Sequence, residues 1–467
     1  MSIIDSPRDP FHRFPFMTTS TPPHHGHHNQ SIERLVDLSD PALNVFLNVS
    51  ADEAVGLLAS GDVDRIREID GQFALVHRAG RTVRLARSIG RPLRYFLAKQ
   101  VAGPCLVVAE RMDEIRDFLE AEGLHGQFHP SYTRMVPAHH LVEIELVGCP
   151  DPNPICTRFF TPQLEKLPAD LDQIGAAYVT ALAAEIDRWL NRVADDAPIG
   201  VLFSGGIDSG AILLVLYWRL LQRGQSPARL KAFTLTLDVG GEDARQASDF
   251  LSTLGLSMLW EPIEVSAAEL NVAETVAVIE DYKPLDVQAA TMTMALCRGI
   301  RQRYPDWKFL IDGDGGDENL KDYPIEENPE LTIRSVLNNQ MLYQEGWGVG
   351  AIKHSLVYTG GQSRGHVRSY APGRQFGFLG FSPFALPNVI EVAEAIPFIE
   401  LTGWDHERLY ALKGEVVSRG VLAITGIQMP VFAKRRFQHG VGEPARLDSV
   451  LSHSEADLRR VFELAIQ

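Results

Sequence analysis

The stretch VLFSGGIDSG, residues 201–210, decides the fold of this chain, because an apolar run passes directly into two glycines, an aspartate and two serines. The run IGVLF at 199–203 is of the kind found in a parallel strand that is buried on both faces. After the glycine turn, the apolar pattern AILLVLYWRLLQRG at 211–224 predicts a helix. Strand, glycine turn and helix in this order indicate an α/β fold.

The residues on either side repeat this alternation. Before the turn, residues 172–196 place apolar side chains at three-and-four spacing and predict a long helix. After it, KAFTLTLD at 231–238 and WKFLID at 307–312 predict strands, whereas ARQASDFLSTLG at 244–255 and ALCRGIRQRY at 295–304 predict helices. Strands that alternate with helices of this length imply a parallel sheet with helices on its faces.

The N-terminal part of the chain has a different character. Residues 1–35 are rich in proline, serine, threonine and histidine, a composition that predicts a mobile tail. Residues 36–165 predict a small, mostly β domain, since FALVHRAGRTVRLARS at 73–88 alternates apolar and polar residues around a turn, as a hairpin does. In the same domain CLVVAER and HLVEIELV predict further strands, and DEIRDFLEAEG predicts one short helix. Residues 166–467 are then expected to form the α/β domain.

Composition and charge exclude several classes of protein. The chain of 467 residues is 45% hydrophobic and carries a net charge of −16, so its field repels polyanions and we expect no nucleic-acid partner. Its four cysteines show no CxxC pair and no zinc spacing, which favours reduced thiols. Because no segment has the length of an apolar membrane span and the N-terminus lacks the apolar core of a signal peptide, we expect a cytoplasmic protein without a membrane partner.

The glycine turn at 204–209 has the chemistry of a phosphate site. A glycine-rich turn that leads from a parallel strand into a helix offers backbone N–H groups and a positive helix end to phosphate. Ser204, Gly205, Gly206 and Ser209 fit such an oxyanion cradle. A carboxylate at Asp208 would repel phosphate unless a divalent cation lay between them, which points to Mg²⁺. The alternative is an ordinary strand-to-helix turn with a serine cap.

A second stretch, FLIDGDGGDENLKDYP at 309–324, repeats the pattern. It leaves a predicted strand through glycines and supplies Asp312, Asp314, Asp317 and Glu318 within a few positions. Carboxylates this close to one another are costly unless a cation or protonation relieves them. Two aspartate-bearing turns that follow strands of one sheet predict the two sides of a binding site for an Mg²⁺-nucleotide. The alternative is an exposed acidic loop.

At these residues the chain resembles a known family. SGGIDS resembles the pyrophosphatase loop of the ATP pyrophosphatases, and GDGGDEN followed by Tyr323 resembles the acidic segment of the asparagine synthetases and the related beta-lactam synthetases. AKRRFQHGVG at 433–442 is similar to the family's C-terminal segment, and IDGQFALVHRAGRTVRLARSIGRPLRYF at 69–96 resembles the latter part of its glutaminase domain. The resemblance implies a parallel-sheet, adenine nucleotide alpha hydrolase-like synthetase domain after a degenerate N-terminal-nucleophile-hydrolase-like domain.

The resemblance implies an ATP-dependent ligase. A substrate carboxylate attacks the α-phosphate of ATP to give an acyl-adenylate and pyrophosphate, and ammonia or an amine then forms the amide and expels AMP. Asp208 and Asp317 match the family's Mg²⁺ ligands, and Asp314 matches the acidic residue that takes a proton from the attacking amine. Lys434 matches the lysine that neutralises charge on the phosphates. The residues that match the ATP and pyrophosphate site are Leu202, Ser204, Gly205, Gly206, Asp208, Ser209, Leu235 and Gly313.

Three departures from the family concern its substrates. Ser2 stands where glutamine-dependent members have a catalytic cysteine, and the region before IDGQFALV is far shorter than theirs. Leu379 and Phe381 stand where the family has a glutamate and an arginine, which indicates a rebuilt substrate wall. Lys321 and Asp322 replace a glycine pair and are expected only to reshape a loop.

Three functions follow as hypotheses. The first is a ligase that joins a small-molecule carboxylate to ammonia or an amine, with ring closure inside one molecule as one form of it. The second is a glutamine-dependent, asparagine synthetase-like amidotransferase that uses Ser2 or a partner glutaminase. The third is a noncatalytic nucleotide-binding scaffold, against which the intact loop residues argue. Members of the family are often homodimers, so we also expect a homodimer.

Overall fold

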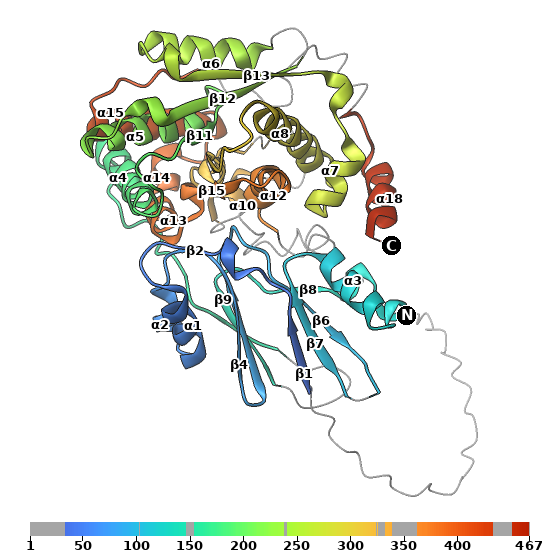
Figure 1. Ribbon diagram of the computed structural model, residues 1–467. Helices are drawn as coiled ribbons and strands as arrows, with labels where there is room; N and C mark the ends of the chain where they lie inside the picture. The colour runs from blue at the N-terminus through green and yellow to red at the C-terminus, as the bar shows by residue number, and fades with distance from the viewer. Residues whose placement is uncertain are drawn as a thin grey trace, which may run out of the picture.

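The structure is a computed structural model that describes residues 33–101, 103–145, 154–237, 241–323, 325, 332–338, 362–432 and 451–466. Lys434 and the rest of the 433–442 segment lie outside the described residues, as do Ser2 and most of the predicted tail. The described chain forms two lobes, an upper one built on a sheet with helices around it and a lower one built mainly from strands (Figure 1).

The upper lobe contains a five-stranded parallel sheet with the strand order β13-β12-β11-β14-β15. The central strand β11 (Ile199–Leu202) and its neighbours β12 (Leu230–Leu237) and β14 (Phe309–Ile311) are the strands that the sequence predicts. The two edge strands, β13 (Trp260–Val265) and β15 (Leu379–Phe381), were not predicted. The parallel α/β fold is therefore confirmed.

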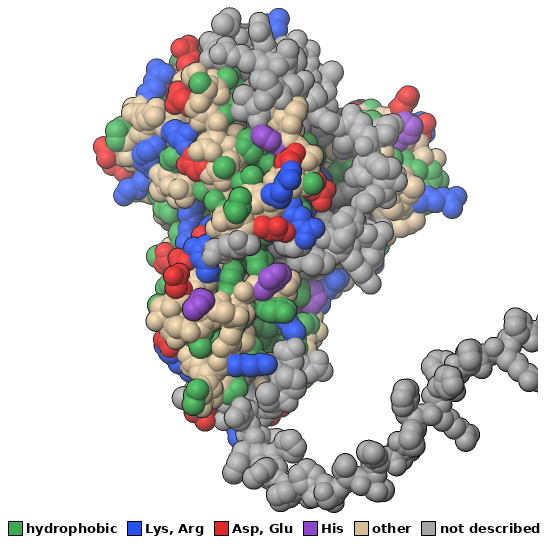
Figure 2. Space-filling model, turned by 90° about the vertical axis from the view of Figure 1, so that its right-hand side faces the viewer, with side chains coloured by type: hydrophobic (Ala, Val, Ile, Leu, Met, Phe, Trp, Pro, Cys, Tyr) green, Lys and Arg blue, Asp and Glu red, His purple; other side chains and the backbone are tan. Residues whose placement is uncertain are grey.

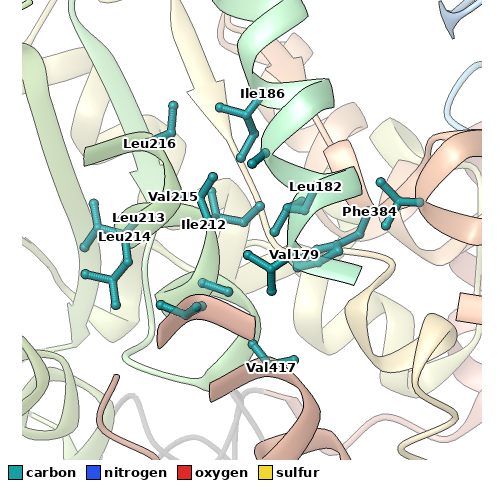
Figure 3. Packing of buried hydrophobic residues seen from close by; sticks show 14 of the residues in the cluster. Val179, Leu182, Ile186, Ile212, Leu213, Leu214, Val215, Leu216, Phe384 and Val417 are labelled. Atoms are coloured by element: carbon teal, nitrogen blue, oxygen red, sulfur yellow. The ribbon is translucent and has the colours of Figure 1, made fainter. Parts of the chain in front are cut away.

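Helices on both faces of the sheet also follow the predictions. They include α4 (Leu171–Leu190), α5 (Ile207–Gln222), α6 (Glu242–Thr253) and α8 (Pro284–Arg303), with α15 (His406–Thr425) packed along α4. Figure 3 shows how Val179, Leu182 and Ile186 of α4 face Ile212 and Val215 of α5. Full burial of one such side chain contributes about 1.5–3 kcal/mol. This packing holds the start of α5, and therefore the glycine turn, against the sheet.

The lower lobe consists mainly of two four-stranded sheets. One has the order β10-β9-β5-β4, and the predicted hairpin forms its antiparallel pair β4 (Ala74–Ala79) and β5 (Thr82–Arg87), beside β9 (His140–Glu145) and β10 (Ile155–Arg158). The other sheet contains β1 (Arg34–Asp37), β7 (Cys105–Ala109), β6 (Arg94–Ala98) and β8 (Arg134–Met135). The predicted helix is α3 (Met112–Ala121), and α1 (Ala51–Ser60) covers β4.

The predicted tail extends slightly too far into the folded chain. Arg34 and Leu35 belong to β1, where they pair in parallel with Cys105 and Leu106 of β7. The composition of residues 1–35 conceals this short strand, because its apolar residues are outnumbered by the polar ones before them.

Buried ion pairs join the two lobes. Arg91 of the lower lobe contacts Glu110, and the second oxygen of Glu110 accepts a 2.6 Å hydrogen bond from Arg374 of the upper lobe. Arg94 lies 3.7 Å from Glu280 of the upper lobe. Separating the lobes would break the contacts of Glu110 with Arg374 and of Arg94 with Glu280. Because Arg91 and Arg94 are fully buried, the loss of these contacts would leave buried charges with fewer partners.

The surface, the helices and the cysteines give three further facts. Basic, acidic and hydrophobic side chains are interspersed over the face drawn in Figure 2. Among the described residues, no helix is both long enough and apolar enough to cross a membrane. Cys105, Cys156 and Cys297 are free thiols, and Cys156 is exposed.

Candidate functional site

The glycine turn lies at the carboxyl end of β11, where it leads into α5 as the sequence predicts. Gly205 has a φ of +74°, and a Cβ atom there would come within 2.8 Å of the backbone nitrogen of Ala247. The Ser204 and Ser209 hydroxyls are 3.3 Å apart, and the backbone N–H of Gly206 donates to Ser204 Oγ at 3.3 Å. The turn is therefore a compact group of hydroxyls at the N-terminus of a helix.

The acidic turn after β14 packs directly on the glycine turn. A Cβ atom on Gly313 would lie 2.9 Å from Cβ of Asp208, and one on Gly316 would lie 2.3 Å from Asp208 Oδ1. Only glycine permits this approach, because any larger residue would push the two turns apart. The structure thus brings the glycine turn and the acidic turn together, with Asp208 and Asp317 on facing sides.

A lysine that the sequence analysis missed lies between these two carboxylates. Lys413 Nζ donates to Asp208 Oδ2 at 2.5 Å and to Asp317 Oδ1, and it lies 3.6 Å from Asp322 Oδ2. The Lys413 side chain is 3% exposed. Burial alone would lower its pKa, but the three carboxylates raise the pKa well above the ordinary value, so the amine is charged.

The donor set at this point suits a magnesium ion. One oxygen from Asp208 and one from Asp317 converge on a single position, where they now hold the Lys413 ammonium. Mg²⁺ in nucleotide sites takes one or two carboxylates, with phosphate oxygens and water as its other ligands. The described residues contain no cluster of three or more metal-binding side chains, so the remaining ligands would have to come from the nucleotide and water.

Asp314 lies in the same acidic turn but in a drier setting. Its backbone N–H donates to Asp312 Oδ1 at 3.0 Å, and Ser382 donates to the other Asp312 oxygen at 2.9 Å. Burial raises the pKa of Asp314 to about 7; Ser369 and Arg368 oppose this rise, and the neighbouring carboxylates reinforce it. A carboxyl that titrates near neutral pH is suited to act as a general base.

Of the other predicted site residues, the structure describes Leu202 and Leu235 but not Lys434. Leu202 ends β11 and Leu235 lies near the end of β12, at the edge of the sheet where the two turns meet. Leu235 as a whole is only 1% exposed and its side chain belongs to the hydrophobic core, so its contact with a nucleotide stays a prediction. Lys434 lies outside the described residues, and its role stays a prediction.

Two departures from the family pattern have a structural outcome. Lys321 and Asp322 do more than reshape a loop: both are buried, Lys321 pairs with Glu394 at 3.2 Å, and Asp322 faces Lys413. The expectation was wrong because their charges are paired inside the protein. Phe381 of β15 is fully buried and stacks on Trp189 at 5.0 Å, whereas Leu379 is 44% exposed.

The sequence pattern of α15 contains an indication of Lys413. The buried residues of α15 include Leu409, Leu412, Val416, Val417, Gly420 and Val421, which repeat at helical spacing. Lys413 occupies a position of this apolar stripe, next to Leu412. A charged residue on the buried face of an amphipathic helix requires a partner, so the pattern could have indicated it.

Comparison with known proteins matches part of the chain to a known family. Residues 184–359 match the asparagine synthase family, and this range includes Asp208 and Asp317 but ends before Lys413. A probable asparagine synthetase (glutamine-hydrolyzing) of Acanthamoeba polyphaga mimivirus is 26% identical over 155 residues, which are 33% of this chain and 26% of that protein. The match therefore spans about a quarter of the length of that relative.

Proposed function

We propose that this chain is an ATP- and Mg²⁺-dependent ligase that releases AMP and pyrophosphate, a proposal supported by the match of residues 184–359 to the asparagine synthase family. It adenylates a substrate carboxylate and joins the acyl group to ammonia or an amine. The observation that carries this proposal is the convergence of Asp208 and Asp317 beside the hydroxyls of the glycine turn, with Lys413 between them.

In the first step, an oxygen of the substrate carboxylate attacks the α-phosphorus of ATP. A bond forms between that oxygen and phosphorus, and the bond from phosphorus to the pyrophosphate oxygen breaks. Ser204, Ser209 and the N-terminus of α5 hold the pyrophosphate by hydrogen bonds and by the helix dipole. Asp208 and Asp317 would hold Mg²⁺, which would neutralise part of the phosphate charge.

Lys413 gives this site a second source of positive charge. Its ammonium already lies at the place where the carboxylates of the two turns meet. If Asp208 and Asp317 held Mg²⁺, the Lys413 ammonium would be available to contact phosphate oxygens and to neutralise part of their charge. Lys434, by its resemblance, adds a further cation as the adenylate forms.

In the second step, the amine nitrogen attacks the acyl carbon, the new carbon–nitrogen bond forms, and the bond to the AMP oxygen breaks. The proton that the nitrogen loses passes to Asp314, whose pKa of about 7 allows it to accept a proton near neutral pH. This division of roles separates the ATP chemistry at Asp208 from the amide chemistry at Asp314.

ATP–pyrophosphate exchange tests the proposal, because it reports adenylation before any amine is known. We expect exchange with at least one member of a panel of amino acids and metabolite carboxylates, and a fall of about 10²-fold or more in Asp208→Asn. Asp249→Asn is the matched control, because Asp249 is an exposed residue of α6 in the same lobe. Failure of every carboxylate to support exchange, with ATP bound or not, would refute adenylation.

The glutamine-dependent and scaffold alternatives are separated by two further measurements. Glutamate released from glutamine in the presence of ATP would support the amidotransferase, for which Ser2 was the candidate nucleophile. Binding of Mg²⁺-ATP without any exchange would support the scaffold. A homodimer, inferred only by resemblance, predicts twice the chain mass in solution.

A further inference from the structure

Lys321 and Asp322 are two charged residues at the end of the acidic turn, where the family has a glycine pair. Both are buried, at 2% and 5% exposed. Their side chains contact different helices: Lys321 pairs with Glu394 at the end of α13 (Pro387–Glu394), whereas Asp322 faces Lys413 of α15. Buried charges are costly unless they are paired, so the shape of a loop does not account for these two residues.

The backbone of Lys321 is held in a conformation that residues other than glycine seldom adopt. Its φ is +56°, in the left-handed region. The Lys321 ammonium lies 3.2 Å from one carboxylate oxygen of Glu394 and 3.5 Å from the other, and 5.3 Å from the centre of the Phe398 ring. These contacts hold the left-handed turn, and with it the direction in which the next residue, Asp322, leaves the chain.

Asp322 is tied to the candidate metal site by its backbone as well as by its side chain. Its N–H donates to the carbonyl oxygen of Asp317 at 2.9 Å, at the end of the short helix α9 (Gly316–Asn319). Its carboxylate oxygen Oδ2 lies 3.6 Å from Lys413 Nζ. The backbone of Asp322 is therefore fixed relative to Asp317, and its carboxylate lies beside the ammonium.

The three carboxylates around Lys413 differ in distance and in exposure. The side chains of Asp208 and Asp317 contact the ammonium directly and are 19% and 37% exposed, so a cation from solution can reach them. The Asp322 side chain is 6% exposed, and its 3.6 Å contact is longer than a hydrogen bond. A cation that engaged Asp208 and Asp317 would compete with Lys413 for these two carboxylates and would leave it the third.

We propose that Asp322 is a positioning residue for Lys413, which keeps the ammonium at the nucleotide site when a divalent cation engages Asp208 and Asp317. This inference rests on the proposed function and adds a residue to its ATP site. A lysine has a long and flexible stem, so the ammonium can shorten its contact with Asp322 without leaving the site. Without a third carboxylate, the buried ammonium would either keep Asp208 and Asp317 or lose its counter-charge, and both outcomes oppose the cation.

Asp322→Asn removes the third carboxylate and keeps the size of the side chain. Because three carboxylates surround one ammonium, the variant still has two of them to balance Lys413, and we expect it to fold. Asp322→Gly, with the residue that the family has here, is a second variant and should behave in the same way. Glu261→Gln is the matched control: Glu261 is also buried, at 6% exposed, and it accepts a 2.8 Å hydrogen bond from Lys231, but it lies in the edge strand β13.

The Tm of the full-length protein is measured against free Mg²⁺ at a fixed ATP concentration, without a carboxylate substrate, so that binding is followed without turnover. We expect the Mg²⁺ concentration at half of the full rise in Tm to be about tenfold higher in Asp322→Asn than in the wild type, within the range of coupling between charges of one network. ATP–pyrophosphate exchange should need about tenfold more Mg²⁺ as well and should approach the wild-type maximum. Glu261→Gln should keep the wild-type Mg²⁺ dependence, whatever its own Tm.

The double variant Lys413→Met with Asp322→Asn separates a positioning role from direct contact with the cation. When the ammonium is absent, Asp322 has nothing to position. The double variant and Lys413→Met alone should therefore reach half of the Tm rise at the same Mg²⁺ concentration.

An unchanged Mg²⁺ dependence in Asp322→Asn and Asp322→Gly would overturn this role. A tenfold loss that persists in the Lys413→Met background would also overturn it, because Asp322 would then act on the cation directly. A wild-type Tm that does not respond to Mg²⁺ would refute the metal site and the role of Asp322 together. Absence of exchange with every carboxylate, with the differences in Tm retained, would instead refute the proposed function and leave the role of Asp322 standing.

Discussion

Replacing Lys413 with methionine removes the ammonium from between three carboxylates and keeps a side chain of similar length. The loss of one partner from a buried ion pair costs about 3–5 kcal/mol, because the other charge stays buried. Here Asp208 is 19% exposed and Asp317 37% exposed, so water offsets part of the cost. We therefore expect Lys413→Met to destabilise the upper lobe by about 2–3 kcal/mol.

Thermal unfolding with and without Mg²⁺ measures this effect and tests the metal site together. At about 2 °C per kcal/mol for a large domain, the Tm of Lys413→Met should fall by about 5 °C. Mg²⁺ should restore more stability to the variant than to the wild type, because the cation can occupy the position that the ammonium has left. Lys231→Met is the matched control: its partner Glu261 lies at 2.8 Å, but Lys231 is 29% exposed, and such pairs contribute only about 0–1 kcal/mol.

The Tm difference between the wild type and Lys413→Met should depend on pH in a definite direction. The pKa of Lys413 is raised in the folded protein, so the stabilisation is fully present below the pKa of an unfolded lysine and is lost only above it. The Tm difference between wild type and variant should therefore persist from about pH 6 to about pH 9. A variant as stable as the wild type, or one that gains no more from Mg²⁺ than the wild type does, would refute this account of the site.

Three other substitutions test separate parts of the molecule. Asp314→Asn should retain ATP–pyrophosphate exchange but lower amide formation by about 10²–10⁴-fold, and the wild-type amide rate should rise with pH through about 7; a pH-independent rate would contradict the base assignment. Gly316→Ala should lower exchange by at least about tenfold, because its methyl group would meet Asp208, whereas Gly56→Ala meets nothing within 4 Å and should leave exchange unchanged. Burial raises the pKa of Glu185 to about 7, so the wild type loses stability as pH rises through that value, and Glu185→Gln should gain Tm relative to the wild type between about pH 5 and about pH 8; a constant difference would argue against a buried titrating carboxyl.

The sequence predicted the fold best where local pattern and burial agree. β11 and α5 are apolar along almost their whole length, so their period and the glycine turn between them identify both elements. The edge strand β13 contains two glutamates and a proline, and its pattern of burial comes from pairing with β12 rather than from its own composition. The edge strand β15 has only three residues, too few to show a period.

The residues of the candidate site likewise divide into those that the sequence could predict and those that it could not. The two turns could be predicted because each has its own glycines and carboxylates, and the parallel sheet brings their ends together. Lys413 could not be placed at the site from spacing alone, because it reaches the site by the packing of the distant helix α15. Likewise, the charges of Lys321 and Asp322 could be interpreted only when their partners were known.

The lower lobe gains a role from this geometry that does not require glutamine hydrolysis. Gln72 and Gly90 line a small cavity between the lobes that Asp314 also lines, and Arg91 and Arg94 tie the same segment to the upper lobe through buried ion pairs. Removal of the lobe would expose this cavity to water, and in the proposed reaction water would compete with the amine for an adenylate formed beside Asp314. The lower lobe would therefore serve the proposed ligase even without glutamine hydrolysis, because it helps to exclude water from Asp314.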